Sequence, residues 1–186
     1  MQEFILASGS SRRQSLLDTL GLHYQIVVPE IDETPGLGEL AGEYVMRMAK
    51  SKASVVSQGL DTTRSVLAAD TCISLDEKII GKPENTEHAK SILQMLSGRR
   101  HQVLTGISLM FEDEEHGLLT SSDLKFKTLT SEMINAYCLT HEPYDKAGAY
   151  AIQGSAGKFI EYVAGSYSNV VGLPLREVSM LLKKAI

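Results

Sequence analysis

The opening of the chain constrains the fold most, because a short apolar run leads straight into a turn of small residues and then into a helix. Residues 4–7 are apolar and predict a buried strand, and residues 8–10, Ser-Gly-Ser, follow as the turn. A helix is expected from about Ser11, with Ser10 as its N-cap and Gly21 as its stop. The chain therefore begins with a strand–turn–helix unit.

Short apolar strands and amphipathic helical stretches alternate along the rest of the chain. Further strands are expected at residues 24–28, 65–69, 103–109, 124–128 and 159–163, with a hairpin joining 72–75 to 79–80 and a polar loop at 112–117. Further helices are expected at residues 40–58, 86–97 and 131–139, and after Pro174. Because the alternation lacks strict βαβ regularity, it predicts an α/β fold with a mixed, twisted sheet and flanking helices. The length of 186 residues fits one domain or two closely packed lobes.

Charge and cysteine content disfavour several classes of protein. Eighteen Lys and Arg against 23 Asp and Glu give a net charge of −5, which argues against a general nucleic-acid or membrane-surface binder. Cys72 and Cys138 have no CxxC or Cys/His spacing, so neither a zinc site nor a disulfide framework is expected. Residues 1–7 lack the features of a signal peptide, and no stretch approaches the roughly 20 apolar residues of a membrane span. We therefore expect a reduced, cytoplasmic chain.

Residues 8–13, Ser-Gly-Ser-Ser-Arg-Arg, form the first candidate site. The motifs GxxxxGKS/T, GxGxxG, HExxH and GxSxG are absent, which argues against the common nucleotide switches, zinc proteases and α/β-hydrolases. At a strand-to-helix turn, free backbone N–H groups, the Ser8 hydroxyl and the guanidinium groups of Arg12 and Arg13 can converge on a phosphate. The pattern predicts a polyphosphate site. The alternative is a Ser-rich helix cap followed by two solvated arginines.

Three acidic residues are candidates for a general base or for metal ligands. Asp70 follows the apolar residues 65–69, so we expect its carboxylate to emerge at the C-terminal edge of that strand, where open α/β sheets place their ligands. The alternative is an Asx turn that closes the strand before Thr71. Asp32 and Glu33 lie in an acidic loop, where they would supply oxygen ligands for a hard cation or simply be solvated.

Two lysines and a glutamine complete the candidate set. Lys52 lies on or beside the apolar stripe of the helix expected at 40–58, and Lys82 stands between a glycine and a proline, where no helix can continue. Taken alone, each lysine is typical of a protein surface. Gln153 carries an amide that can donate to and accept from the edge of a base, and the alternative is a strand-end glutamine satisfied by backbone. The histidines share no ligand spacing and receive no role.

Seven short motifs occur in order along nearly the whole chain. They are Leu-Ala-Ser-Gly-Ser-Ser-Arg-Arg at 6–13, Ala-Asp-Thr at 69–71, Gly-Lys-Pro at 81–83, Leu-Ser-Gly at 96–98, Asp-Lys-Ala-Gly-Ala-Tyr at 145–150, Ile-Gln-Gly at 152–154 and Val-Gly-Leu-Pro at 171–174. With these motifs the sequence resembles the Maf family of nucleoside triphosphate pyrophosphatases, from about residue 4 to residue 182. Each motif is short, and their joint order carries the resemblance.

The resemblance implies a Maf/ITPase-like fold over residues 1–186, with two closely packed lobes around a nucleotide cleft, and a homodimer. It also implies hydrolysis of a nucleoside triphosphate to the monophosphate and pyrophosphate with a divalent cation, Mg²⁺, Mn²⁺ or Co²⁺. Asp70 matches the proton acceptor for the attacking water. Arg12, Thr71 and Gln153 match the family positions that set base preference. The family positions that bind the phosphates are matched by Ser8, Arg13, Lys52 and Lys82.

Residues 145–154 are similar to the branch of the family that acts on dTTP and UTP, whereas the branch that acts on 7-methyl-GTP carries a different segment there. The sequence departs from the family at Ser11, where Pro is usual, which should loosen the turn slightly without removing a ligand. The resemblance implies a part in clearing the nucleotide pool and a link to cell-division arrest. The alternatives are a 7-methyl-GTP pyrophosphatase and a non-catalytic nucleotide-binding regulator of division.

Overall fold

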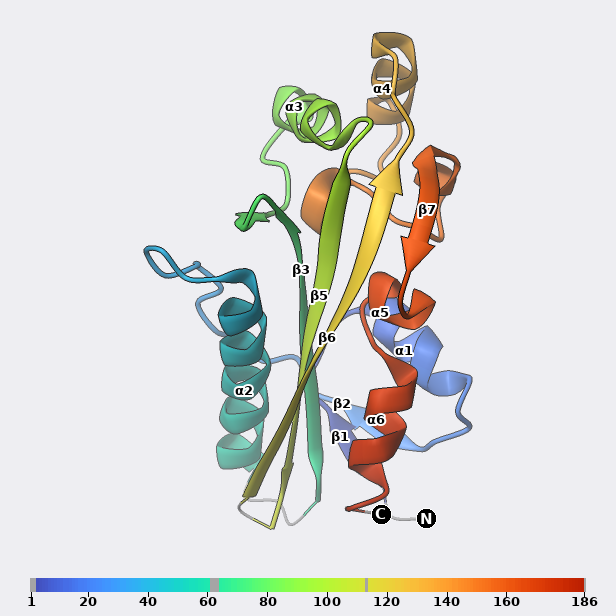
Figure 1. The fold of residues 1–186 in the computed structure, drawn as a ribbon. Helices are drawn as coiled ribbons and strands as arrows, with labels where there is room; N and C mark the ends of the chain where they lie inside the picture. The colour runs from blue at the N-terminus through green and yellow to red at the C-terminus, as the bar shows by residue number, and fades with distance from the viewer. Residues whose placement is uncertain (1–2, 61–63, 113, 186) are drawn as a thin grey trace.

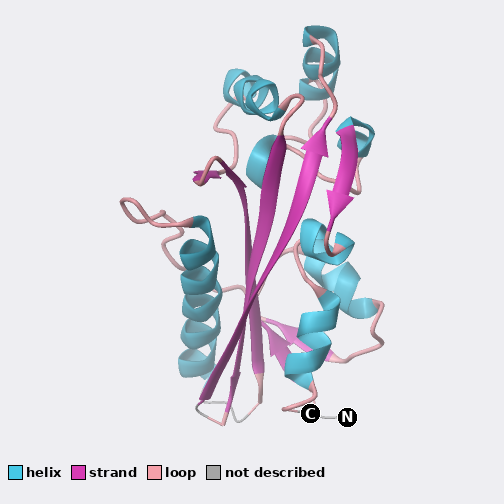
Figure 2. Cartoon of the chain, viewed as in Figure 1, coloured by secondary structure: helices cyan, strands magenta, loops and turns pink. Residues whose placement is uncertain are grey.

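A mixed seven-stranded sheet runs through the described part of the chain (Figures 1 and 2). The structure is a computed structural model that describes residues 3–60, 64–112 and 114–185. The strands are β1 (Phe4–Leu6), β2 (Tyr24–Ile26), β3 (Val66–Leu75), β4 (Lys78–Ile80), β5 (Arg100–Phe111), β6 (Glu114–Phe126) and β7 (Ile160–Ala164). The helices are α1 (Ser11–Asp18), α2 (Ala41–Leu60), α3 (Thr86–Leu96), α4 (Ser131–Cys138), α5 (Tyr167–Val171) and α6 (Leu175–Leu182), with 3₁₀ turns η1 (Ala147–Ala149) and η2 (Ser155–Phe159).

The strand order is β2-β1-β3-β5-β6-β7, and β4 pairs with β3 as a short hairpin. β1 is parallel to both β2 and β3, while the remaining pairs are antiparallel. This combination confirms the prediction of an α/β fold with a mixed, twisted sheet and flanking helices. The elements expected near both termini are also present, including the opening strand–turn–helix unit and the last helix after Pro174.

β3 is longer than the sequence pattern indicates. Nine of its ten residues are buried, and it continues through Asp70 to Leu75. The predictions that Asp70 ends a strand, or closes it with an Asx turn, are therefore wrong. The reason is not local: residues 66–74 pair one by one with β5, and this pairing satisfies the backbone of polar and apolar residues alike.

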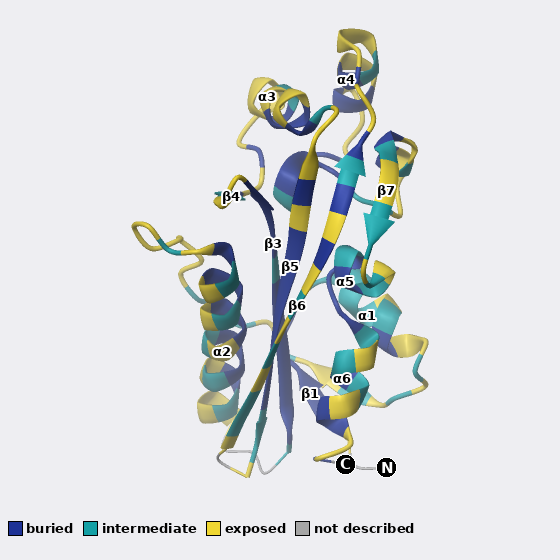
Figure 3. Ribbon diagram, viewed as in Figure 1, coloured by how far each residue is buried: buried dark blue, intermediate teal, exposed yellow. Residues whose placement is uncertain are grey.

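The ladder between β5 and β6 is also longer than expected. Residues 114–117, which the polar composition predicted as loop, belong to β6 and pair with residues 108–111. The first eight residues of β6 are exposed or intermediate, and burial is confined to Ser122, Leu124 and Phe126 near its end (Figure 3). The five-residue helix α5 was not predicted, because it is too short to display a helical stripe.

Helices cover both faces of the sheet, with α2 on one face and α5 and α6 on the other (Figure 1). Side-chain alternation along β3 accounts for the two layers. Val66 and Ala68 pack with α2, whereas Leu67 and Ala69 pack with α6. The side of α2 that meets the sheet is buried in Figure 3.

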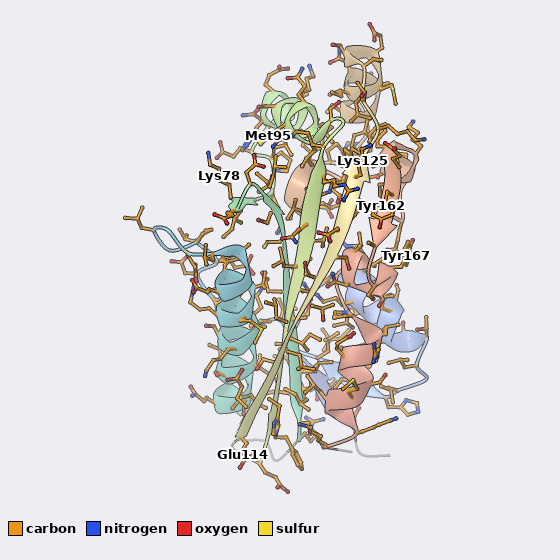
Figure 4. The ribbon with its side chains drawn as sticks, in the orientation of Figure 1. Lys78, Met95, Glu114, Lys125, Tyr162 and Tyr167 are labelled. Carbon is orange, nitrogen blue, oxygen red and sulfur yellow. The ribbon has the colours of Figure 1, made fainter. Side chains whose placement is uncertain are left out.

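A further core cluster lies where α3 and α4 pack at one end of the sheet. Phe126 contacts both Tyr150 and Phe159 in edge-to-face geometry, with ring centroids 4.8 and 6.2 Å apart. Met95 lies toward this end of the molecule, and Glu114 lies at the opposite end of the long β5–β6 ladder (Figure 4). The long strands therefore join two separate packing regions.

Gly106 allows α2 to lie unusually close to the middle of the sheet. It stands opposite Asp70 in the β3–β5 ladder. A Cβ atom at this position would lie 2.6 Å from the carbonyl carbon of Val45 and 2.8 Å from the backbone nitrogen of Met46, both in α2. The missing side chain therefore brings α2 within reach of the middle of β3.

We expect Gly106→Ala to lower the free energy of unfolding by about 1–3 kcal/mol, because the added methyl group forces the α2 backbone away from β5. Urea denaturation measures the change. Gly59→Ala is the matched control, since a Cβ at Gly59 meets nothing within 4 Å and Ala favours a helix. Equal stability of Gly106→Ala and the parent protein would show that α2 does not need this close approach.

Candidate active site

A cavity of about 660 Å³ opens between the two ends of the molecule. Its wall combines residues 7–13 and the loop after β2 with β3, the segment 79–82 and the Gly-rich segment 145–153. The predicted site residues that line it are Ser8, Arg12, Arg13, Glu33, Lys52, Asp70, Thr71, Lys82 and Gln153. Asp32 is the one candidate that does not line it. A volume of this size suits a ligand of a few hundred daltons.

Lys52 joins two of the acidic residues of the cavity, Glu33 and Asp70. Its Nζ lies 2.6 Å from Asp70 Oδ1 and 2.5 Å from Glu33 Oε1. The Lys52 side chain is only 9% exposed and that of Asp70 only 10%, whereas Glu33 is about half exposed. The interpretation of Lys52 as a surface lysine is therefore wrong: its place on the apolar stripe of α2 puts it against the sheet, where the carboxylates neutralise it.

Asp70 and Thr71 point to opposite faces of β3 because successive strand side chains alternate. Asp70 follows Val66 and Ala68 on the face covered by α2, and it therefore meets Lys52. Thr71 lies on the other face, where its hydroxyl accepts a hydrogen bond of 3.2 Å from Arg13. Two adjacent residues thus bring two cations to opposite sides of the same strand.

Arg13 is fixed by hydrogen bonds from all three of its guanidinium nitrogens. Nε donates to the carbonyl of Gly172 at 2.9 Å, Nη1 to Ser8 Oγ at 3.2 Å and Nη2 to Thr71 Oγ1. Burial lowers the pKa of Arg13, although the charge of Asp70 opposes this effect. Arg13 is therefore not the solvated residue of the alternative interpretation. Nor does Ser10 cap α1 with its side chain; its backbone N–H donates to Ser8 Oγ at 3.2 Å.

Arg12, Lys82 and Gln153 also reach the cavity, and their side chains make no hydrogen bond with the described residues. Lys82 is exposed as expected, and its turn is tied to the Gly-rich segment by a 2.9 Å bond from Gly148 N–H to the Gly81 carbonyl. Gln153 is likewise exposed, so the alternative of an amide satisfied by backbone is wrong. These three side chains are free to meet a ligand.

The loop that carries Glu33 is held over the cavity by α2. Tyr44 donates its hydroxyl proton to the Glu33 carbonyl at 2.9 Å. Burial alone would raise the pKa of the Glu33 carboxyl, but the hydrogen bond from Lys52 and the charges of Lys52, Lys82 and Arg13 outweigh it and hold the pKa below its ordinary value. Glu33 is therefore ionised at neutral pH.

Asp32 belongs to a local turn. Its Oδ1 accepts the backbone N–H of Thr34 at 2.9 Å, and this turn lowers the pKa of its carboxyl in an exposed setting. Among the described residues, no group of three or more His, Cys, Asp or Glu side chains is arranged to hold a metal ion. The carboxylates in the cavity wall are those of Glu33, Asp70 and Asp145.

Among the cavity residues to which sequence reasoning gave no role are Tyr44, Asp145, Lys146 and Tyr150. Lys146 pairs with Asp145 and donates to the Glu142 carbonyl at 2.9 Å. Tyr150 OH lies 2.7 Å from His101 Nε2, which fixes the ring at the back of the cavity. The available signals were the helical spacing of Tyr44 with Lys52 and the motif at residues 145–150, which contains the other three residues. The contact between Tyr150 and His101 joins residues 49 positions apart, which no local pattern indicates.

Both cysteines lie in the interior of the protein. Cys72 and Cys138 are both buried and free of disulfides. Burial raises the pKa of the Cys72 thiol to about 12, so it is not a reactive thiolate. No helix in the described ranges is long and apolar enough to cross a membrane.

The sequence matches the family described as Maf-like protein over residues 3–185. The chain belongs to the Maf-like family. A dTTP/UTP pyrophosphatase of Acinetobacter baylyi is 46% identical over 179 residues, which cover 96% of this chain and 97% of that protein. Proteins of the same name from Colwellia psychrerythraea and Bacillus cereus are 46% and 41% identical, each match covering 99% of this chain and 89% and 90% of theirs.

Solved structures of Ham1 proteins share the Maf-like fold of this chain. The Staphylococcus aureus protein matches with a TM-score of 0.57 at 15% identity, covering 98% of this chain and 99% of its own. The Coxiella burnetii protein matches with a TM-score of 0.56 at 18% identity over the full length of both chains. At these identities the likeness concerns the fold alone.

We expect Lys52→Met to lower the free energy of unfolding by about 3 kcal/mol, because it leaves the buried Asp70 carboxylate without its cation. The double variant Lys52→Met/Asp70→Asn should recover most of that loss, and a urea double-mutant cycle measures the coupling. Lys50→Met is the control, since Lys50 lies in the same helix with an exposed side chain paired to Glu115. Additive effects would contradict a buried ion pair.

We expect stability to fall on acidification through His101. Burial lowers the pKa of His101 to about 4, whereas an unfolded histidine takes up its proton near its ordinary value of 6.5. The unfolded state therefore binds the extra proton first, and the free energy of unfolding decreases by about 3 kcal/mol from pH 7 to pH 4. Urea denaturation across this range should show a smaller decrease for His101→Gln. Identical pH dependence would exclude His101 as a cause.

Proposed function

We propose that this chain hydrolyses the α–β phosphoanhydride of nucleoside triphosphates, with preference for dTTP and UTP, to the nucleoside monophosphate and pyrophosphate. One observation carries the proposal: the Asp70 carboxylate lies in the wall of a cavity that also presents Arg12, Arg13, Lys52 and Lys82. A base surrounded by cations suits attack on a polyphosphate. The names of the relatives from Acinetobacter, Colwellia and Bacillus support the same reaction and bases.

The cations of the cavity would bind and orient the triphosphate. Arg13 is held by Ser8, Thr71 and Gly172 before any ligand arrives, so little rotational freedom is lost when it meets a phosphate. Arg12 and Lys82 line the same cavity and have no hydrogen-bond partner within the described residues, which leaves their charge available. Together they would neutralise charge that develops on the departing pyrophosphate.

Asp70 would act as the proton acceptor. Lys52 occupies Oδ1, whereas Oδ2 makes no hydrogen bond with the described residues and can accept one from water. The water oxygen forms a bond to the α-phosphorus, its proton passes to Asp70, and the bond from the α-phosphorus to the bridging oxygen breaks. That oxygen leaves with the pyrophosphate.

Asp70 and Glu33 also fit a divalent cation. Lys52 Nζ already lies between Glu33 Oε1 and Asp70 Oδ1, so a cation would be held by the carboxylate oxygens that Lys52 does not contact. Mg²⁺, Mn²⁺ and Co²⁺ accept carboxylate oxygens, and Mg²⁺ typically binds one or two carboxylates together with substrate phosphates. When bound, such a cation would supply charge neutralisation on the phosphate oxygens. Asp32 is not part of this proposal.

Gln153 would select the base. Its amide can donate one hydrogen bond and accept another, and a uracil or thymine edge offers matching groups. Gln153 lies at the end of the Gly-rich segment and lines the same cavity as Arg12 and Arg13. By resemblance to the family we further propose a cytoplasmic homodimer that clears nucleotides from the pool; light scattering tests the dimer.

We expect Asp70→Asn to lower kcat for dTTP and UTP by about 100- to 10,000-fold, because the amide cannot accept the proton. The assay measures monophosphate and pyrophosphate from dTTP, UTP, CTP, GTP and 7-methyl-GTP, with Mg²⁺, Mn²⁺ or Co²⁺ and with a chelator. Asp123→Asn on β6 is the control, since Asp123 pairs with Gln102 and does not line the cavity.

Thermal unfolding of each variant shows whether the fold is retained. Retained activity in folded Asp70→Asn would remove Asp70 from the reaction. Preference for 7-methyl-GTP would assign the chain to the other branch, and nucleotide binding without turnover would favour a regulator. Activity that survives the chelator would remove the metal from the proposal.

A further inference from the structure

The Glu142 carboxylate is the centre of a hydrogen-bond cluster beside Gln153. Oε2 accepts from the backbone N–H of Ser155 at 2.9 Å and from its hydroxyl at 2.7 Å. Oε1 accepts from the backbone N–H of Ala156 at 3.2 Å and from Tyr137 OH at 3.0 Å. Three of these four hydrogen bonds come from the two residues that begin η2, immediately after the Gln153–Gly154 pair.

Glu142 is itself held in place by its neighbours. Its backbone N–H donates to Thr140 Oγ1 at 3.3 Å, and its carbonyl accepts from Lys146 Nζ at 2.9 Å. Tyr137 belongs to α4 and is buried in the core cluster beneath it. Burial would raise the pKa of the Glu142 carboxyl, but the hydrogen bonds from Ser155, Ala156 and Tyr137 outweigh it and keep the pKa below its ordinary value. The cluster is therefore built around a charged carboxylate.

Gly154 shows how closely the chain wraps this carboxylate. A Cβ atom at Gly154 would lie 2.6 Å from Glu142 Oε2 and nearer still to Oε1. A side chain at this position would push the Glu142 carboxylate away from the backbone that follows Gln153. The Gly154 N–H also donates to the Ala151 carbonyl at 3.1 Å, which tightens the turn that contains Gln153.

We propose that Glu142 is the positioning residue for base recognition, because it anchors the turn that presents the Gln153 amide to the cavity. This inference rests on the proposed function and extends it to a residue outside the cavity wall. The Gln153 side chain makes no hydrogen bond with the described residues, so its location depends on its backbone. Without the Glu142 anchor, the turn must be ordered when the nucleotide binds, which weakens binding of the base and leaves the reacting phosphate untouched.

The test compares Glu142→Ala and Glu142→Gln with the parent protein. We expect Glu142→Ala to raise KM for UTP about tenfold with kcat within about twofold, and to lower the preference for UTP over GTP about tenfold. Glu142→Gln should show a smaller shift in the same direction, because one end of the amide can no longer accept from Ser155. If Glu142→Ala does not fold, Glu142→Gln and Tyr137→Phe still remove single hydrogen bonds.

Combining Glu142→Ala with Gln153→Ala distinguishes a positioning role of Glu142 from a general effect on stability. In Gln153→Ala the amide is absent, so adding Glu142→Ala should change KM for UTP by less than about twofold. Glu161→Ala is the control: Glu161 is an exposed carboxylate on β7 that pairs with Lys125, labelled on β6 in Figure 4. It should leave KM, kcat and base preference unchanged.

Several results would overturn the inference. The first is a fall in kcat of Glu142→Ala that is equal for UTP and GTP. The second is an additive effect of Glu142→Ala and Gln153→Ala on KM for UTP, and the third is an unchanged preference for UTP in folded Glu142→Ala. If the parent protein hydrolyses no nucleotide, the proposed function fails, and calorimetric binding of UMP against GMP decides the inference alone. Loss of UMP selectivity in Glu142→Ala would then support it, and equal selectivity in variant and parent would reject it.

Discussion

The buried ammonium group of Lys52 is the interaction on which the arrangement of the cavity depends. A cation on the apolar stripe of a helix that packs against a sheet is costly unless charges of opposite sign lie beside it. Asp70 of β3 and Glu33 of the loop after β2 supply those charges, at 2.6 and 2.5 Å from Nζ. One ammonium group therefore holds a helix, a strand and a loop together, and the close approach of α2 at Gly106 makes the contact geometrically possible.

The opposite face of β3 carries a second cation, and the two cations differ in how they are held. Arg13 donates to Ser8, Thr71 and Gly172, which are neutral acceptors, so its positive charge is oriented without being cancelled. Lys52 is paired with carboxylates instead. The polar pair Asp70-Thr71 lies in the middle of a strand that is mostly apolar and buried. Polar residues in a buried strand are expected at functional sites, where side chains needed for binding or catalysis replace apolar ones.

Local patterns predicted much of the fold and many candidate residues. Caps and apolar spacing located α1, α2, α3 and α4 within a few residues, since these signals arise from neighbours in the chain. The same patterns misplaced the end of β3, the start of β6 and the burial of Lys52. Each of these depends on a partner far away: β5 for the two strands, and Asp70 for the lysine. No local pattern records such pairing.

The sequence therefore predicts which residue types line the cavity, because hydroxyls, guanidinium groups and carboxylates at turns and strands indicate a site for a charged ligand. The tertiary structure determines the distances between these side chains. It turns Asp70 toward α2 and Thr71 toward Arg13, leaves Asp32 in a solvent-facing turn, and brings Glu142 against residues that follow Gln153. Other contacts of the cavity join residues still farther apart in the chain, as between Arg13 and Gly172, which are 159 positions apart. Strand register and helix packing set them, and both are properties of the assembled core.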